Sequence, residues 1–376
     1  MKHFRSCNLS ILVFLLSAFT LQACTSRRAF TVKEQEIVVS SVDEVVYAIK
    51  TAKAGDVIQV KSGDYKFEKR IDIQISGSAE HPITLIAHEK NKARPVFDFS
   101  ALGEGNSNQG LILRASYWQI KGIEITKAGD NGILINGNNN LIENCSFSQC
   151  SDTGLQLDSH AANNLILNCD SYFNADSKIE NADGFACKID VGSGNKFKGC
   201  RAWQNLDDGW DGYLKQTDNV STVFEDCWAF NNGILENGEL SGGDGNGFKT
   251  GGSDNKLLKH NTTYTNCISA GNVKNGFDHN SNRGEVTLIG CKAYDNKQKN
   301  FSFGKKNPVS KLTIKDCIVL GAPGSLEADI KDISGNNWQL NQTLQPGNFK
   351  GVDINELKKP RKADGSLPDI NFMKVK

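Results

Sequence analysis

The chain is made of short apolar runs, each broken within a few residues by Gly, Asn or Asp, and seven of these runs lead into a cysteine. An apolar residue stands two or three places before each cysteine, and no helical period links one run to the next. This pattern predicts short strands separated by turns. The seven segments are IENCSFSQC, ILNCDSYFN, FKGCRAWQN, FEDCWAFNN, YTNCISAGN, LIGCKAYDN and IKDCIVLGA.

The segments recur at a nearly constant interval. From Cys145 to Cys317, successive cysteines are 24, 31, 27, 40, 24 and 26 residues apart, so a coil of about 24 residues carries insertions of varying length. Repeated short strands of this kind predict an all-β, single-stranded right-handed parallel β-helix, in which each coil lies about 4.8 Å from the previous one.

Equivalent residues of successive coils stack in rows, which decides how the cysteines and asparagines are interpreted. The seven cysteines become an inward row of small apolar side chains, because free cysteine is among the most buried residue types. A disulfide between neighbouring coils is the alternative in an exported protein. Five of the cysteines have an asparagine five positions later, which predicts a ladder of amide hydrogen bonds from coil to coil. These asparagines are Asn174, Asn205, Asn232, Asn272 and Asn296.

Both ends of the predicted solenoid have a pattern of their own. In SSVDEVVYAIKTA, Ser41 is a candidate N-cap with Glu44 three residues later, which predicts a short helix capping the first coil. The apolar face of this helix would consist of Val42, Val45, Val46 and Ile49. The segment AGDVIQVKSGDY should then form the first strand. From about residue 336 the repeat fades, and residues 336–376 are expected to form an irregular tail that packs back on the coils.

The N-terminus has the order of a bacterial export signal. Lys2 and Arg5 precede the apolar run ILVFLLSAF, which is too short to span a membrane as a stable helix. The residues before Cys24 resemble a lipobox, which implies a diacylated cysteine and anchoring at the outer membrane or cell surface. Plain secretion is the alternative. We therefore expect a leader at 1–23, a tether at 24–35 and a β-helix domain at 36–376, with its functional coils at about 145–325.

The charge balance narrows the range of partners. Without a leader that contains Lys2 and Arg5, the chain has 41 basic and 43 acidic residues. This balance argues against a nucleic-acid binder with a large basic face. Membrane contact is expected only through the lipid anchor, and a solenoid with capped ends is expected to be a monomer.

A second marker recurs once per coil, a glycine followed by a large apolar residue, as in DTGLQ, ADGFA, DDGWD, GNGFK and NGFDH. Placing these glycines in one row makes the neighbouring positions of the coils comparable. The residues that follow the glycines should form an inward core row. This row is Leu155, Phe185, Trp210, Phe248, Phe277 and Phe301, the last of which follows Asn300 in place of a glycine.

Four acidic residues flank the core row on adjacent coils. Because side chains alternate along a strand, Asp183, Asp207, Asp208 and Asp211 should meet on the outward face. Carboxylates that are this close repel one another unless a cation lies between them. Calcium accepts an irregular cage of oxygen ligands better than magnesium does. An aspartate beside a glycine is also a common turn former, but four on one face favour a calcium site.

Lys249 occupies the row position of Asp211 one coil later, within the glycine-rich segment GDGNGFKTGG. Small residues here leave the backbone open to a ligand. A partly desolvated lysine beside a cation has a lowered pKa and can act as a base. Most lysines are solvated surface groups, but its position beside the acidic row favours a functional role.

Three segments of the chain resemble a known family. The segments NADGFACK, GSGNKFKGCRAWQNLDDGWDGY and GDGNGFKTGG closely resemble the family 9 polysaccharide lyases, which are right-handed parallel β-helix pectate lyases, over about residues 110–325. The resemblance implies that the four aspartates are calcium ligands and that Lys249 is the Brønsted base. It further implies β-elimination on a uronic acid of an acidic plant cell-wall polysaccharide, which yields 4,5-unsaturated oligosaccharides.

Other residues are candidates for contact with sugar carboxylates or sugar rings. The charged candidates are Lys188, Arg201, Lys215, His279 and Arg283, each of which could instead belong to a solvated face. Trp203 and Tyr213 could be sugar platforms or packing residues.

Three alternatives to cleavage of pectic galacturonan stay open. A lyase acting on rhamnogalacturonan I would use the same calcium and lysine. A β-helix pectin hydrolase would need a suitably spaced pair of carboxyl groups, and the lysine fits that chemistry poorly. A non-catalytic glycan binder would have no use for a base beside the metal.

Overall fold

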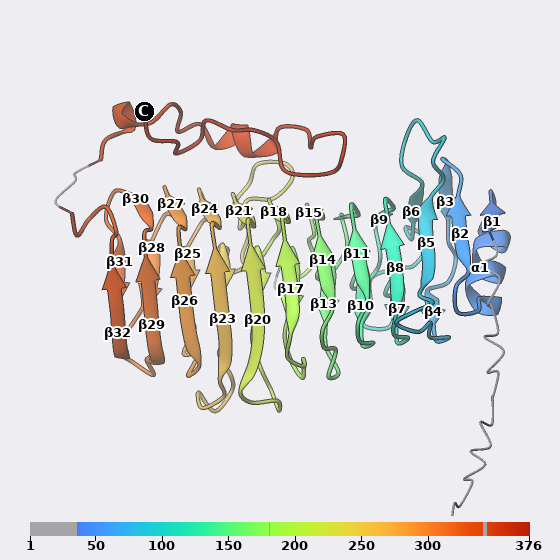
Figure 1. The fold of residues 1–376 in the computed structure, drawn as a ribbon, viewed down its shortest axis with the longest axis horizontal. Coiled ribbons are helices and arrows are strands. Elements are labelled where there is room, and N and C mark those ends of the chain that lie inside the picture. Colours follow the sequence, from blue (N-terminus) through green and yellow to red (C-terminus); the bar gives the residue numbers. More distant parts are fainter. Residues whose placement is uncertain (1–35, 180, 341–343) are drawn as a thin grey trace, which may run out of the picture. The chain divides into compact units, whose positions relative to one another are not determined.

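The structure is a computed structural model, and it describes residues 36–179, 181–340 and 344–376. The chain winds through three parallel sheets, A, B and C, and each coil adds one strand to each sheet (Figure 1). The predicted all-β parallel β-helix is therefore confirmed. The predicted leader, Cys24 and the tether lie outside the described residues. Within the described ranges, no helix is both long enough and apolar enough to cross a membrane.

Sheet A contains twelve strands, and every neighbouring pair is parallel. Its strands are β1 (Glu36–Val39), β2 (Val57–Val60), β5 (Ile83–Ala87), β8 (Trp118–Lys121), β11 (Leu141–Glu143), β14 (Leu165–Leu167), β17 (Asn195–Lys198), β20 (Val220–Glu225), β23 (His260–Thr265), β26 (Glu285–Ile289), β29 (Val309–Lys315) and β32 (Ala328–Ser334).

Sheets B and C have ten strands each. Sheet B consists of β3 (Asp64–Lys66), β6 (Val96–Asp98), β9 (Glu124–Thr126), β12 (Ser146–Ser148), β15 (Asp170–Tyr172), β18 (Arg201–Trp203), β21 (Trp228–Phe230), β24 (Ile268–Ala270), β27 (Lys292–Tyr294) and β30 (Ile318–Leu320). Sheet C consists of β4 (Ile71–Ile73), β7 (Leu111–Leu113), β10 (Ile133–Ile135), β13 (Leu155–Leu157), β16 (Phe185–Cys187), β19 (Trp210–Asp211), β22 (Phe248–Lys249), β25 (Asn275–Asp278), β28 (Lys299–Phe303) and β31 (Gly324–Leu326).

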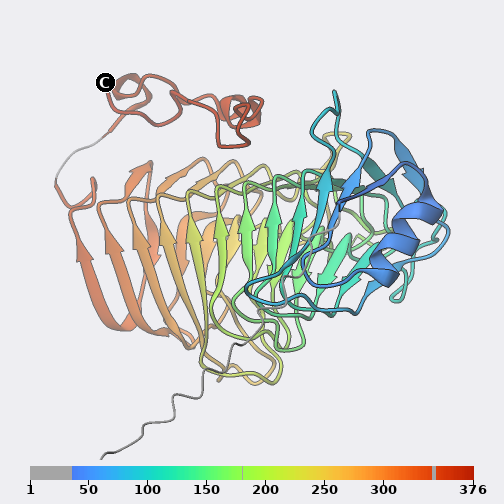
Figure 2. The same ribbon diagram turned by 45° about the vertical axis from the view of Figure 1, so that its right-hand side comes forward.

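The N-terminal end of the solenoid is covered by α1 (Val42–Thr51) (Figure 2). Ser41 is its N-cap, as predicted, and its hydroxyl accepts a hydrogen bond from the Glu44 backbone N–H. Val45 and Ile49 are buried against the first coil. The segment predicted as the first strand does contain a strand, β2, but β1 precedes the helix and pairs with β2, so β2 is not the first strand. The segment EIVV has only four residues, too few to show the alternation of polar and apolar residues that predicts a strand, and the helix pattern follows it directly.

The interior confirms the two predicted inward rows. The aromatic residues after the glycines stack with ring centroids 4.9 Å apart for Phe185 and Trp210, 4.8 Å for Trp210 and Phe248, and 4.9 Å for Phe248 and Phe277. All seven cysteines of the repeat, from Cys145 to Cys317, are buried and free. The alternative of a disulfide between coils is therefore wrong for these residues.

The turns between coils explain the rest of the pattern. The residue before each repeat cysteine has a positive φ, between 54° and 63°, which favours Asn, Asp and Gly. The five predicted asparagines form a buried ladder, in which the Asn205 side chain donates to Asn232 Oδ1 at 3.0 Å and the Asn232 side chain donates to Asn272 Oδ1 at 2.9 Å. Each of these asparagines lies two residues after a strand of sheet B, so the ladder fixes the start of the turn from sheet B to sheet C.

Residues 344–376 cover part of the outward face of sheet B and contain two short 3₁₀ helices, η1 (Pro346–Asn348) and η2 (Ile354–Lys358). Four apolar side chains of residues 344–376 pack against sheet B: Phe349, Leu357, Phe372 and Met373. A buried ion-pair cluster joins this tail to the coils, because Arg201 and Arg361 both donate to Asp170. Arg201 also donates to the carbonyl oxygens of Leu357 and Lys359.

Candidate functional site

The candidate site lies where the chain passes from sheet B into three successive strands of sheet C. Asp183 precedes β16, Asp207 and Asp208 precede β19, and Asp211 ends β19. Lys249 ends β22 and is in direct register with Asp211. The register between coils that the glycine row predicted is therefore the observed one.

The carboxylates of Asp183, Asp207 and Asp208 converge. Each offers an oxygen within 4.8 Å of the other two, and the three residues are 1%, 6% and 0% exposed. Asp211 is also buried and lies beside this group, although it is not a member of the closest three. The aspartates therefore meet as predicted, but they are covered, whereas the strand alternation suggested an open face.

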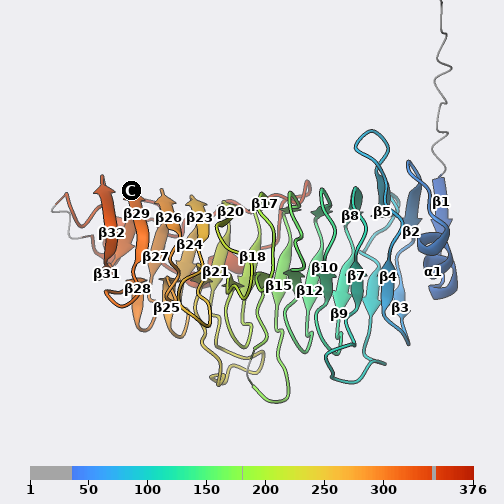
Figure 3. The ribbon, with the colours of Figure 1, turned by 90° about the horizontal axis from the view of Figure 1, so that it is seen from below.

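Two insertions in the turns from sheet B to sheet C extend from the same side of the solenoid, one after β15 (green) and one after β21 (yellow) (Figure 3). The second insertion contacts the cluster, because the backbone N–H of Asp244 donates to Asp207 Oδ1. Asn246, at the end of this insertion, donates to Asp208 Oδ1 from its backbone at 2.7 Å and from its side chain at 2.8 Å. Backbone and amide donors thus fix the orientation of the carboxylates before any ligand arrives.

Two lysines flank the aspartates on opposite sides. Lys188 Nζ lies 2.7 Å from Asp183 Oδ2 and 3.5 Å from Asp211 Oδ2. Lys249 Nζ lies 3.0 Å from Asp208 Oδ2 and 3.7 Å from Asp211 Oδ1. Asp211 is therefore shared between the two ammonium groups. Lys188, expected only as an auxiliary residue, is part of the cluster itself.

The pKa values of the cluster are set by its burial and by the proximity of four carboxylates to two lysines. Burial, and then neighbouring charges, raise the pKa values of Asp183, Asp207 and Asp208 to about 7. Burial also acts to raise the pKa of Asp211, but Lys249 and Lys188 reverse this effect and lower it. Burial acts to lower the pKa of Lys249, but Asp208, Asp211 and Asp207 raise it well above its ordinary value. The protein's own groups therefore do not produce the lowered pKa expected for Lys249.

The donor set fits a hard divalent cation. It consists of carboxylate oxygens, which are the ligands that calcium prefers. Asp208 Oδ2 is buried and accepts no hydrogen bond, although Lys249 Nζ is 3.0 Å away. A buried carboxylate oxygen without a hydrogen bond is costly and indicates a missing partner. The cluster could thus hold a metal ion.

Comparison with known proteins identifies the family. The model described as "Pel9A-like, right handed beta helix region" matches residues 29–315. The chain belongs to this family, that of the family 9 polysaccharide lyases. Pectate lyase L of Paenibacillus polymyxa (strain SC2) is 38% identical over 87% of this chain and 76% of that protein. Pectate lyase L of Dickeya chrysanthemi is 34% identical over 87% of this chain and 77% of its own length.

Two solved structures agree with this assignment. The crystal structure of pectate lyase Pel9A is 30% identical, with a TM-score of 0.82, and covers 92% of this chain and 90% of its own. A rhamnogalacturonan lyase is 25% identical, with a TM-score of 0.77, over 88% and 91% of the two chains. The protein is therefore an enzyme, a polysaccharide lyase with a right-handed parallel β-helix.

The remaining candidate residues of this family 9 lyase are more scattered. Lys215 is exposed in the turn that follows β19. The His279 ring nitrogens contact the carbonyl oxygens of Ser302 and Lys306. Arg283 pairs with Asp329 at 3.4 Å. The structure therefore places none of these three side chains in the aspartate cluster.

Two of the candidates lie away from the site. Arg201 is 4% exposed and bound to Asp170 and the tail, so it is not available to a substrate, contrary to our expectation. The tail was expected to pack back on the coils, but the repeat did not show that it would cover Arg201. Trp203 stacks between Tyr172 and Phe230, with ring centroids 4.5 and 5.6 Å away, and acts in packing.

Tyr213 is closer to the site than Trp203. Its backbone N–H donates to Asp211 Oδ1 at 3.1 Å, and its hydroxyl donates to Asp254. Its pKa is raised to about 12, by burial and by the neighbouring carboxylates. Tyr213 therefore helps to orient Asp211.

Asp244 and Lys274 were missed by the sequence analysis. Asp244 Oδ2 lies 3.7 Å from Lys249 Nζ, and Asp244 Oδ1 contacts Lys274 Nζ. Asp244 lies within the quoted segment GDGNGFKTGG, but it belongs to an insertion, so the register between coils could not place it. The long interval of 40 residues between Cys227 and Cys267 was the only signal that something lies over the site.

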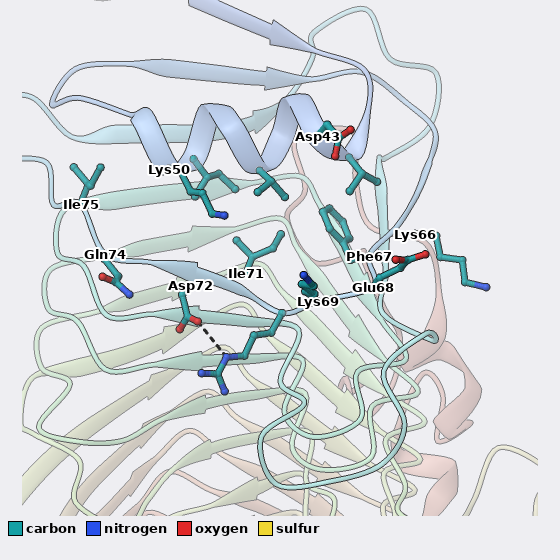
Figure 4. Close-up of a pocket in the computed structure, with 14 residues that line it drawn as sticks. Asp43, Lys50, Lys66, Phe67, Glu68, Lys69, Ile71, Asp72, Gln74 and Ile75 are labelled. Atoms are coloured by element: carbon teal, nitrogen blue, oxygen red, sulfur yellow. Dashed lines mark hydrogen bonds and ion pairs between the residues drawn. The ribbon is translucent and has the colours of Figure 1, made fainter.

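A cavity of about 880 Å³ lies elsewhere, between α1 and the segment from β3 to β4 (Figure 4). Its lining mixes apolar side chains such as Phe67 and Ile71 with Lys50, Lys69 and the ion pair of Arg70 and Asp72. It holds no converging carboxylates and no base paired with them. We therefore assign the chemistry to the aspartate and lysine cluster rather than to this cavity.

Proposed function

We propose that this polysaccharide lyase cleaves pectic galacturonan by β-elimination, with calcium held by Asp183, Asp207, Asp208 and Asp211 and with Lys249 as the base. The observation that carries this proposal is the position of Lys249, in register with Asp211 and 3.0 Å from Asp208. A buried metal site without a chemical role would not need an amine among its ligands. The relatives named pectate lyase support the substrate class.

The four aspartates come from two adjacent coils and can present oxygens to one ion. When bound, calcium would neutralise the uronate carboxylate and make the proton at C5 more acidic. The backbone donors from Asp244 and Asn246 hold Asp207 and Asp208 in place for this role. Lys188 neutralises part of the remaining charge on Asp183 and Asp211.

Lys249 removes the C5 proton as a neutral amine. The carboxylates that raise its pKa are those that would face the cation, so loading the site weakens this effect and burial then favours the neutral form. The proton moves from C5 to Nζ, a double bond forms between C4 and C5, and the C4–O bond breaks with its electron pair on the leaving oxygen. Water is not consumed.

A second candidate substrate is rhamnogalacturonan I. It is favoured by the similarity to a solved rhamnogalacturonan lyase. We favour galacturonan, because the relatives named pectate lyase L reach 38% and 34% identity. An inverting hydrolase is disfavoured, since the closest carboxylate oxygens lie within 4.8 Å of one another, whereas an inverting pair is roughly 6.5–9.5 Å apart.

The test uses polygalacturonate and, separately, rhamnogalacturonan I, each with calcium and with a chelator. Ultraviolet absorbance of the unsaturated product should rise on polygalacturonate and should vanish with the chelator. A rise in absorbance on rhamnogalacturonan I alone would mean that rhamnogalacturonan I, not galacturonan, is the substrate. New reducing ends without absorbance would indicate hydrolysis, and no cleavage of either polymer would favour a glycan binder.

We also infer that the enzyme is exported, with Cys24 as the lipidated residue, because its polymeric substrate cannot enter the cell intact. Mass spectrometry of the cell-associated protein should find a diacylated Cys24 at the mature N-terminus. A soluble protein cleaved elsewhere in the leader would point to plain secretion. The β-helix should sediment as a monomer.

A further inference from the structure

Asp244 lies in the last part of the insertion between β21 and β22, close to the start of β22, and this part is fixed over the cluster. Ser241 Oγ donates to the Leu206 carbonyl oxygen, and the Asp244 backbone N–H donates to Asp207 Oδ1. Gly243 allows this approach, since a Cβ there would lie 3.0 Å from the Cα atom of Asp207. The position of Asp244 is therefore set by the backbone of the site itself.

The Asp244 carboxylate lies between two lysines from successive coils. Its Oδ2 is 3.7 Å from Lys249 Nζ, and its Oδ1 pairs with Lys274 Nζ. Lys274 also makes a backbone contact with the insertion, because its N–H donates to the Gly245 carbonyl oxygen at 2.9 Å. Burial acts to raise the pKa of Asp244, but Lys274 and Lys249 lower it, so the group is ionised at neutral pH.

The other partners of Lys249 are the oxygens that a cation would take. Its ammonium lies near Asp208 Oδ2 and Asp211 Oδ1, both on predicted metal ligands. Among the ion pairs of the described residues, Asp244 is its only partner outside the four predicted ligands. When the aspartates turn to a cation, Asp244 is the carboxylate that remains to hold Lys249 beside the reacting carbon.

We propose that Asp244, held in place by Lys274, is the positioning residue for Lys249, which keeps the base at the site after the cluster has taken up its cation. This inference rests on the proposed function. Asp244 touches neither the cation nor the substrate in this scheme and acts only through Lys249. A misplaced base slows proton transfer without weakening substrate binding, so the effect should appear in kcat.

The test compares Asp244→Asn with Glu239→Gln. Both remove one negative charge from the same insertion, but Glu239 is exposed and bonds only within the insertion. For Asp244→Asn we expect kcat to fall about tenfold, with KM changed less than about twofold. Calcium affinity, measured by calorimetry without substrate, should change less than about threefold. Glu239→Gln should match the wild type, and Asp244→Glu should recover part of the loss.

Lys274→Met tests the second member of the pair. Its loss in kcat should be in the same direction and should add little to the loss from Asp244→Asn, because the two residues act as one unit. An unchanged kcat in Asp244→Asn would overturn the inference, as would a calcium affinity that falls in parallel with kcat. If Lys249→Ala stayed active, the proposed function would fail instead, whatever the result at Asp244.

Discussion

Asp208 Oδ2 lies 3.0 Å from Lys249 Nζ, yet this buried oxygen accepts no hydrogen bond. The ammonium is close enough to attract the carboxylate but is not directed at its lone pairs. The lysine therefore offsets part of the charge of Asp208 and leaves the oxygen free to bind a cation. Base and metal ligand are adjacent, and each can be tested separately.

Lys249→Ala should lose activity by roughly 10²–10⁴-fold, which is the usual contribution of a general base. Calcium affinity should stay the same or rise, because the ammonium and the cation compete for Asp208 and Asp211. Absorbance assays and calorimetry on the same preparation measure the two quantities. Lys256→Ala, which removes a lysine over the Tyr213 ring, is the control. A variant that kept a substantial rate on its true substrate would refute the mechanism.

Asp208→Asn should separate ligand loss from structural damage. The amide oxygen can still accept from the Asn246 backbone, so the turn is preserved. Calcium affinity should fall by at least about tenfold, whereas the chelated variant should melt at the same temperature as the chelated wild type or higher, because a buried, repelled carboxylate is gone. A lower melting temperature in the chelated variant would show that Asp208 is structural.

The chelated enzyme should lose stability through its aspartate cluster as the pH rises from about 4 to about 7. The pKa values of Asp183, Asp207 and Asp208 are about 7 in the folded state, against an ordinary 3.8. In this window the folded state binds more protons than the unfolded chain, so raising the pH favours unfolding. Above about pH 7 the effect levels off, and calcium should reverse it.

The control for this pH dependence is the double variant Asp207→Asn with Asp208→Asn. Burial lowers the pKa of His260, so this group makes the folded state more stable as the pH rises, opposite to the effect of the aspartates. Because His260 is present in both proteins, its contribution cancels in the comparison. In the presence of chelator, the melting temperature of the double variant relative to that of the wild type should rise between pH 5 and pH 7. A constant difference over this range would contradict the raised aspartate pKa values.

The sequence predicted those features that depend on the register between coils. The cysteine and glycine rows fixed which residues lie side by side on successive coils. From this alignment alone, Asp183, Asp208 and Asp211 could be brought together and Lys249 placed one coil later. In a parallel β-helix, equivalent residues of successive repeats lie side by side. Alignment of the repeats was therefore enough to predict which residues are neighbours on adjacent coils.

Features outside the repeat could not be predicted in the same way. Asp244 reaches Lys249 from an insertion with no counterpart on other coils. Arg201 was predicted as a candidate for contact with substrate because nothing in its own coil shows that residues 344–376 cover it. Lys188 was predicted only as an auxiliary residue, because the repeat does not give the direction of its long side chain. These contacts depend on the paths of loops, which the repeat does not encode.

The asparagine ladder should make a measurable contribution to stability. Asn232 is buried, and its Oδ1 accepts from both the backbone and the side chain of Asn205. Asn232→Ala leaves the Asn205 backbone N–H without a partner and its side-chain amide with only the Ser171 carbonyl oxygen, and should reduce the free energy of unfolding by about 1–3 kcal/mol. Urea unfolding measures the change, with Asn237→Ala in an exposed turn as the control. Equal stability of the two variants would mean that the ladder is dispensable.

The tail should depend on Arg361 for its attachment to the coils. Arg361 donates to Asp170 and to the Gly199 carbonyl oxygen, and Asp170 is buried. Arg361→Met leaves that carboxylate paired with Arg201 alone, so the cost should be below the roughly 3–5 kcal/mol of a buried charge that loses its whole pairing. Limited proteolysis should then cut the tail sooner than in Lys362→Met, which removes a lysine whose ion-pair partner, Asp369, is largely exposed. Because the aspartate cluster lies on sheet C and the tail on sheet B, the rate on substrate at low temperature should be preserved. A loss of that rate before the tail is cut would show that the two surfaces are coupled.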